Sequence, residues 1–236
     1  MKEIGMMFQG PLVRAILELR KQQTRRIAKT EITMGRDSLL APHRGRKSAD
    51  VYLLPERAKE AAALSPAQIG DRIYVRETYW AWGRWETRYS EAKGRDEWHF
   101  LDMSAECSQP YLYAADGISQ GRVKRNGGVT PTYWRRPALL MPKVAARIWL
   151  EVTGVRVEPL QSISKADAVR DGGLHQLPAT GRYVINQGDQ YFGGATHDPR
   201  ELFQEIWEST GGDWAANPWV WVTDFKLLSS TGKPQA

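Results

Sequence analysis

Three segments of the chain alternate between apolar and polar side chains at every second residue, and this pattern constrains the fold most strongly. The segments are 72–79, 147–158 and 219–227. A period of two is typical of a β-strand with one buried face. Residues 3–8 predict a further short strand. Strands outnumber helices and their connections are irregular, which favours an α+β fold, a small mixed or closed barrel, over a doubly wound parallel sheet.

Helix signals are fewer and local. Pro11 suits the first turn of a helix, and the apolar residues after it have helical spacing, so we expect a helix that continues into the basic run 20–26. Ser164 is a good N-cap for a second helix, which the Gly-Gly pair at 172–173 ends. The Asp-Pro pair at 198–199 predicts a third helix.

Two details refine the strands. Glu77 has the same parity as Ile73 and Val75, so a buried face would require a partner for this carboxylate, such as an arginine. Gly154 lies where the alternation of 147–158 slips, which predicts a β-bulge.

The composition suits one domain. The 236 residues are 42% hydrophobic and 25% charged, enough for a packed core. No apolar run of 18 residues and no signal-peptide pattern occurs in the sequence, and Cys107 is the only cysteine, so we expect a cytoplasmic protein without a membrane segment. The expected organisation is a single domain over 1–228, insertions at about 28–68, 83–132 and 174–197, and a disordered tail at 229–236.

Positive charge is concentrated near the N-terminus. The chain has a formal net charge of +6, and residues 14–47 hold ten basic and three acidic side chains. Such a segment attracts polyanions, nucleic acid first, although a solvated charged loop is the alternative. The ten tryptophans are candidates for core packing, and a few for stacking on bases.

Most ordinary enzyme motifs are absent from the sequence. The four histidines lack metal-ligand spacing, and neither a phosphate-binding glycine loop nor a Gly-x-Ser-x-Gly elbow occurs. Cys107 in a polar loop is interpreted as inert. We therefore expect no metal and no cofactor.

Four blocks of the sequence are spread along the chain, at 13–26, 70–78, 134–155 and 217–222. In this order they resemble the ASCH-domain family, especially its phage and prophage members. The resemblance implies a PUA-like (ASCH) mixed β-barrel with helices packed at its openings. It also implies binding of RNA or of a modified nucleoside.

The resemblance further implies a chemistry. Small bacterial members hydrolyse the acetyl amide of N4-acetylcytidine with a lysine, a threonine three residues later, and an acidic residue. Lys21 and Thr24 match the first two, and Asp171 matches the acid by position. Thr24 would attack the carbonyl, and Lys21 would accept its proton. Asp171 would orient the lysine or protonate the leaving amine.

The surrounding charges support this assignment. A lysine crowded by Arg20, Arg25 and Arg26 should have a lowered pKa, because like charges disfavour its protonated form. These arginines, together with Arg76 and Glu77, are the candidate contacts to substrate or nucleic acid. One arginine would stabilise the oxyanion.

Simpler roles stay open at this point. Lys21 would be a solvated helix-end cation, Thr24 a cap or strand residue, and Asp171 a helix-end carboxylate. Glu77 is interpreted first as an arginine's partner. At the level of function, the alternatives to an amidohydrolase are a non-catalytic module that binds RNA or a modified base, and a ribonuclease.

Overall fold

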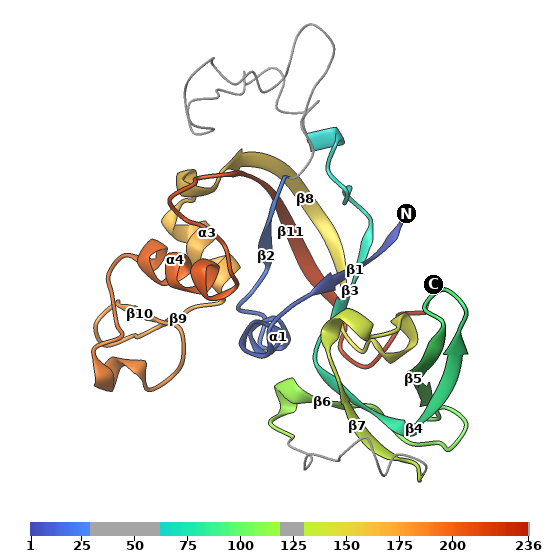
Figure 1. Cartoon of the computed structure of the whole chain (residues 1–236). Coiled ribbons are helices and arrows are strands. Elements are labelled where there is room, and N and C mark those ends of the chain that lie inside the picture. Colours follow the sequence, from blue (N-terminus) through green and yellow to red (C-terminus); the bar gives the residue numbers. More distant parts are fainter. Residues whose placement is uncertain (29–61, 119–129, 236) are drawn as a thin grey trace, which may run out of the picture.

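The architecture is α+β (Figure 1), and the computed structural model describes residues 1–28, 62–118 and 130–235. These residues form three α-helices, a five-stranded sheet, a second sheet around a long hairpin and a short two-stranded ladder. No helix in the described ranges is both long and apolar enough to cross a membrane. Most of the expected insertion 28–68 lies outside these ranges, as do the basic residues from Lys29 to Lys47.

The five-stranded sheet has the order β1–β3–β8–β11–β2. Its strands are β1 (Glu3–Met7), β2 (Gln23–Ile27), β3 (Arg72–Arg76), β8 (Trp149–Pro159) and β11 (Trp219–Ser229). The β1–β3 pair is parallel and the other three pairs are antiparallel. The register between β8 and β11 shifts beside Gly154, which confirms the predicted β-bulge.

The described strands form no closed barrel, so the expectation of a closed sheet is not met. β1 and β2 are the two edges of the sheet, and α1 (Gly10–Leu17) connects them at one end (Figure 1). A side chain bridges the edges in place of a strand pair: the Arg26 guanidinium donates to the Met7 carbonyl at 2.6 Å. Edge strands without mutual backbone pairing leave the sheet open.

Two further helices follow the predicted caps. The Ser164 hydroxyl accepts from the Asp167 amide at the start of α3 (Lys165–Gly172), which ends at Gly173 with φ 60°. Asp198 caps α4 (Pro199–Ser209), whose proline occupies the first turn. α3 and α4 pack together beside β2 and β11 (Figure 1).

The sheet buries apolar side chains in two clusters, because its faces are covered by different helices. One cluster contains Val13 and Ile16 of α1 with residues of β3 and β8. The other contains Phe203 and Trp207 of α4 with Val220 and Val222 of β11. The apolar residues whose spacing indicated strands and helices in the sequence therefore form the core.

The second sheet lies where irregular chain was expected. β4 (Tyr79–Ser90) and β5 (Arg95–Asp102) form a hairpin, and β4 also pairs with β6 (Leu112–Tyr113) and β7 (Thr132–Arg136). No strand was predicted over 83–102, where most of this hairpin lies within the expected insertion 83–132. Cross-strand aromatic contacts, such as Trp85 against Phe100 at 5.4 Å between ring centroids, stabilise a strand pair that looks polar in sequence.

The remaining expected loops are also partly ordered. Within 174–197, β9 (His175–Gln176) pairs with β10 (Tyr183–Val184). The tail expected to be disordered from 229 is held at the Gly232 amide, which donates to the Arg147 carbonyl at 2.8 Å. Lys233 pairs with Glu3 at 3.0 Å. These contacts tie the end of the chain to its beginning.

Candidate active site

The basic run after the first helix is a strand, not a helical extension. α1 ends at Leu17, and Leu19 adopts a positive φ of 60° that reverses the chain. β2 then pairs with β11, so that Thr24 lies opposite Thr223. The predicted continuation of the helix through 20–26 is wrong, because pairing with β11 satisfies the backbone of this segment better than a solvated helix end would.

The Lys21 amine lies buried between β2 and the end of α3. Its Nζ donates to the Asp171 Oδ1 at 2.7 Å, to the Gln23 carbonyl at 2.8 Å and to the Asp171 carbonyl. The residue is 2% exposed. Three acceptors satisfy all three protons of an ammonium. A cation at this place is also favoured by the C-terminal carbonyls of α3. The alternative of a solvated lysine is therefore excluded.

Burial is the main influence on the charge of Lys21. It lowers the pKa of the amine, because water no longer solvates the ammonium, while Asp171 opposes this effect. Arg26 and Arg25 lower the pKa further. The direction of the sequence expectation is confirmed, but crowding by arginines is the smaller cause.

Asp171 joins two cations. Its Oδ1 accepts from Lys21, and its Oδ2 accepts from the Arg25 Nη1 at 2.9 Å. The neighbouring Gly173 permits this approach of α3, since a Cβ there would lie 2.5 Å from the Ala15 side chain. The Gln22 amide also donates to the Arg170 carbonyl at 3.0 Å. The end of α3 is therefore fixed against the chain that precedes β2.

Lys21, Thr24 and Asp171 line one cavity of about 370 Å³. This volume is in the range of small-molecule sites. The other walls come from β2, from the end of β1, from α1 and from α4, and include Phe8, Leu12, Arg25, Arg26, Phe203, Ile206 and Trp207. The cavity lies along β2 at the edge of the sheet. Consecutive strand residues point to opposite faces, so Thr24 and Arg25 reach it from different sides.

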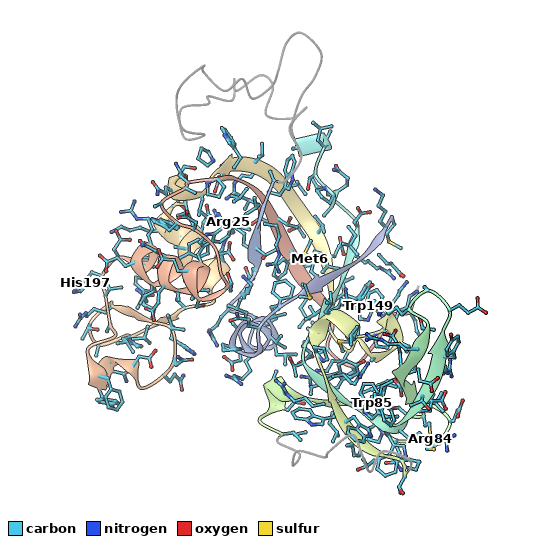
Figure 2. The ribbon with its side chains drawn as sticks, viewed as in Figure 1. Met6, Arg25, Arg84, Trp85, Trp149 and His197 are labelled. Atoms are coloured by element: carbon cyan, nitrogen blue, oxygen red, sulfur yellow. The ribbon has the colours of Figure 1, made fainter. Side chains whose placement is uncertain are left out.

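Aromatic rings and cations are neighbours in this cavity. The Phe8 ring lies under the Lys21 amine at 5.8 Å and under the Arg26 guanidinium at 5.3 Å. The guanidinium of Arg26 lies against the Phe8 ring, and the resulting loss of solvation lowers its pKa even though the residue as a whole is exposed. Arg26 is an exposed residue of the rim, whereas Arg25 is buried between β2 and α3 (Figure 2).

Three of the predicted contact residues lie elsewhere. Arg20 donates to Glu18 at 2.5 Å and lines a second cavity, of about 470 Å³. Arg76 donates to the Leu139 carbonyl and does not line the first cavity. Glu77 is 1% exposed and accepts from the Arg147 Nε at 3.0 Å. The predicted arginine partner of Glu77 is thereby confirmed, while its place among the substrate contacts is not supported.

Several residues of the site escaped the sequence interpretation. Phe8 and Phe203 belong to a strand end and a helix face that predicted core packing alone. Glu158 accepts from the Arg25 Nη2 at 2.6 Å, and Asp167 lies 3.8 Å from the same nitrogen. No pattern in the sequence singled out Glu158, which lies at the end of the predicted strand 147–158.

The larger cavity borders the first and shares Gln9, Leu12 and Ile206 with it. Hydroxyl, imidazole and carboxylate side chains also line the larger cavity, namely those of Ser209, His175, Glu18 and Glu205, but no lysine does. The smaller cavity holds the three residues that the sequence predicted together, Lys21, Thr24 and Asp171, and is therefore the candidate active site. Comparisons of the chain with protein-family models, with curated proteins and with solved structures found no match.

Proposed function

We propose that this protein is an amidohydrolase that removes the acyl group from N4-acetylcytidine or a related N-acyl nucleoside, on an open PUA-like (ASCH) fold. One observation carries the proposal: an amine, a hydroxyl and a carboxylate from segments 150 positions apart line one cavity. Three buried aromatic side chains in the walls, those of Phe8, Phe203 and Trp207, and a rim arginine suit a flat, polar base.

The reaction would proceed through an acyl-enzyme. The Thr24 hydroxyl attacks the acyl carbonyl while Lys21, in its neutral form, takes the hydroxyl proton. The C–N bond then breaks, Lys21 returns the proton to the exocyclic nitrogen, and cytidine leaves. Water hydrolyses the ester on Thr24 to acetate, which restores the hydroxyl. Arg26 on the rim is placed to donate hydrogen bonds to the developing oxyanion.

The proton inventory of Lys21 sets a condition for this mechanism. In the ammonium form the nitrogen has no lone pair to accept the Thr24 proton, and its three protons are donated to three acceptors. Loss of one proton leaves two donors and frees the lone pair. The lowered pKa of Lys21 makes this form more accessible than in water.

The satisfied resting ammonium also favours a second candidate function. A Lys21 that keeps its proton would be a fixed positive charge in the floor of the cavity. In that case the protein would bind a modified base or RNA without hydrolysing it.

The test is incubation with N4-acetylcytidine and, separately, with acetylated RNA, with cytidine and acetate measured by chromatography. We expect cytidine from the nucleoside, and a loss of about 10²-fold or more in rate for Thr24→Val. Thr223→Val is the matched control, since Thr223 is equally buried and lies opposite Thr24 but does not line the cavity.

Three outcomes would contradict the proposed hydrolysis or the role of Thr24 in it. Binding without release of cytidine would favour the binding module. Strand breaks in RNA would favour a ribonuclease, because amide hydrolysis leaves the phosphodiester intact. Equal losses in Thr24→Val and Thr223→Val would show that a folding defect, not a missing nucleophile, explains the result.

A further inference from the structure

A continuous row of charged side chains extends from the buried Lys21 to the partly exposed Glu158 near the end of β8. Lys21 bonds Asp171 at 2.7 Å, Asp171 bonds Arg25 at 2.9 Å, and Arg25 bonds Glu158 at 2.6 Å. The Arg25 side chain is 0% exposed, and Glu158 is the first member that reaches solvent, at 19%. Each of the two Asp171 oxygens therefore faces one cation.

Arg25 is held from several sides. Its Nη1 donates to the Gln23 Oε1 at 2.6 Å as well as to Asp171, and its Nη2 donates to Glu158. Its guanidinium carbon lies 5.7 Å from the centre of the Phe203 ring. A guanidinium engaged in this way is not available to a phosphate, unlike an exposed arginine. The expected role of Arg25 as a contact to nucleic acid is therefore disfavoured.

We propose that Arg25 is a positioning residue of the site: anchored by Glu158, it fixes the Asp171 carboxylate in the orientation that presents one oxygen to Lys21. This inference rests on the proposed function. Without Arg25 the carboxylate would be free to rotate about its side-chain bonds. A fixed carboxylate holds the amine in the cavity that Thr24 also lines, and small misplacements of such groups are costly in rate.

The same geometry couples Arg25 to the charge of Lys21. The charged groups that face Lys21 are Asp171 from α3 and Arg25 and Arg26 from β2. β1 and α4 contribute aromatic rings to this region. Removal of Arg25 deletes a positive charge near Lys21, and it leaves the Asp171 carboxylate with Lys21 as its only cationic partner. Both effects stabilise the protonated form of Lys21 and raise its pKa. Removal of the Glu158 charge acts in the opposite direction, because Arg25 is then less neutralised.

The experiment compares Arg25→Met, Arg25→Lys and Glu158→Gln with the matched control Arg156→Met. Arg156 bonds the other oxygen of Glu158 at 2.9 Å but is half-buried and has no contact with Asp171. The first readout is the pH profile of kcat on N4-acetylcytidine. The second is the pH titration of the Lys21 ammonium by proton–nitrogen NMR, which does not require hydrolysis. Lys21→Met identifies the signal, and circular dichroism checks folding.

We expect Arg25→Met to lower kcat about tenfold or more with little change in KM, since positioning affects the transition state. The profile and the ammonium titration should move to higher pH, and Arg25→Lys should recover part of kcat. Glu158→Gln should move both readouts to lower pH, which tests the role even if Arg25→Met does not fold. Arg156→Met should leave both readouts in place.

Two results would overturn the positioning role. One is a folded Arg25→Met whose kcat profile and ammonium titration match the wild type. The other is the same shift in Arg156→Met, which would indicate a general charge effect. A wild-type protein without hydrolysis would refute the proposed function, while the ammonium titration would still decide the role of Arg25.

Discussion

Asp171→Asn is the substitution that most directly probes the buried charges of the site. Asp171 is 4% exposed and is the only carboxylate that contacts Lys21 in the described part of the chain. The amide keeps the size of the side chain but removes its charge. It leaves two buried cations, Lys21 and Arg25, without the group that joined them. Arg25 retains Glu158, so Lys21 bears most of the loss.

The expected cost follows from the burial of both partners. Removing one partner of a buried ion pair typically costs about 3–5 kcal/mol, because the other charge stays buried without compensation. For a chain of this length that corresponds to a fall in Tm of roughly 6–20 °C. The cost should shrink at high pH. The folded pKa of Lys21 lies below its ordinary value of 10.5, and loss of Asp171 lowers it further.

The sign of the pH effect follows from linkage. Between the folded pKa of Lys21 and 10.5, the unfolded chain binds a proton that the folded variant has released. Stability therefore rises with pH in that window, and it rises over a wider window in Asp171→Asn than in the wild type. The assay is urea unfolding of both proteins from pH 6 to pH 10. Asp96→Asn, at an exposed residue of β5, is the control.

Two outcomes would refute this reasoning. A loss of less than about 1 kcal/mol in the free energy of unfolding at pH 6 would mean that the Lys21–Asp171 pair contributes no more than an exposed salt bridge. A loss that stays constant from pH 6 to pH 10 would show that Lys21 does not change its charge in the variant.

Three further predictions concern the frame around the site. Gly173→Ala should cost about 1–3 kcal/mol in chemical unfolding, because φ is 60° there and the new Cβ would lie 2.5 Å from a side-chain carbon of α1; no loss would contradict the close approach. Ser164→Ala should cost about 1 kcal/mol through loss of the α3 cap, and an unchanged urea midpoint would count against it. Glu77→Gln should cost about 3 kcal/mol, because Glu77 is buried against Arg147. Asp116 pairs with the same arginine but is more exposed, so Asp116→Asn should lower the free energy of unfolding by less than about 1 kcal/mol. Equal losses for Glu77→Gln and Asp116→Asn would refute the role of burial.

Much of the fold could be predicted from local patterns. The strands β3, β8 and β11 follow from alternation, and the starts of α3 and α4 follow from Ser164 and Asp198. These signals involve residues close in sequence, where backbone geometry and capping act directly. The β4–β5 hairpin was missed, because its stability comes from cross-strand aromatic contacts between positions far enough apart to leave no short-range signal.

The site divides in the same way. Lys21, Thr24 and Asp171 were selected by resemblance, and their presence in one cavity depends on the docking of α3 against the chain before β2. The sequence also grouped Arg20, Arg25 and Arg26 as one basic run. In the structure, Arg20 lines another cavity, Arg25 is buried between charges, and Arg26 lies on the rim.

The sequence by itself determined the strands β3, β8 and β11 and the starts of α3 and α4, and it contained the residue types that the proposed amide hydrolysis needs. Only the tertiary structure decided which charges are buried together. A carboxylate 150 positions from Lys21 becomes its partner because α3 packs onto the edge of the sheet. The physical reason is that desolvation depends on all neighbours in space, whereas local sequence specifies only neighbours along the chain.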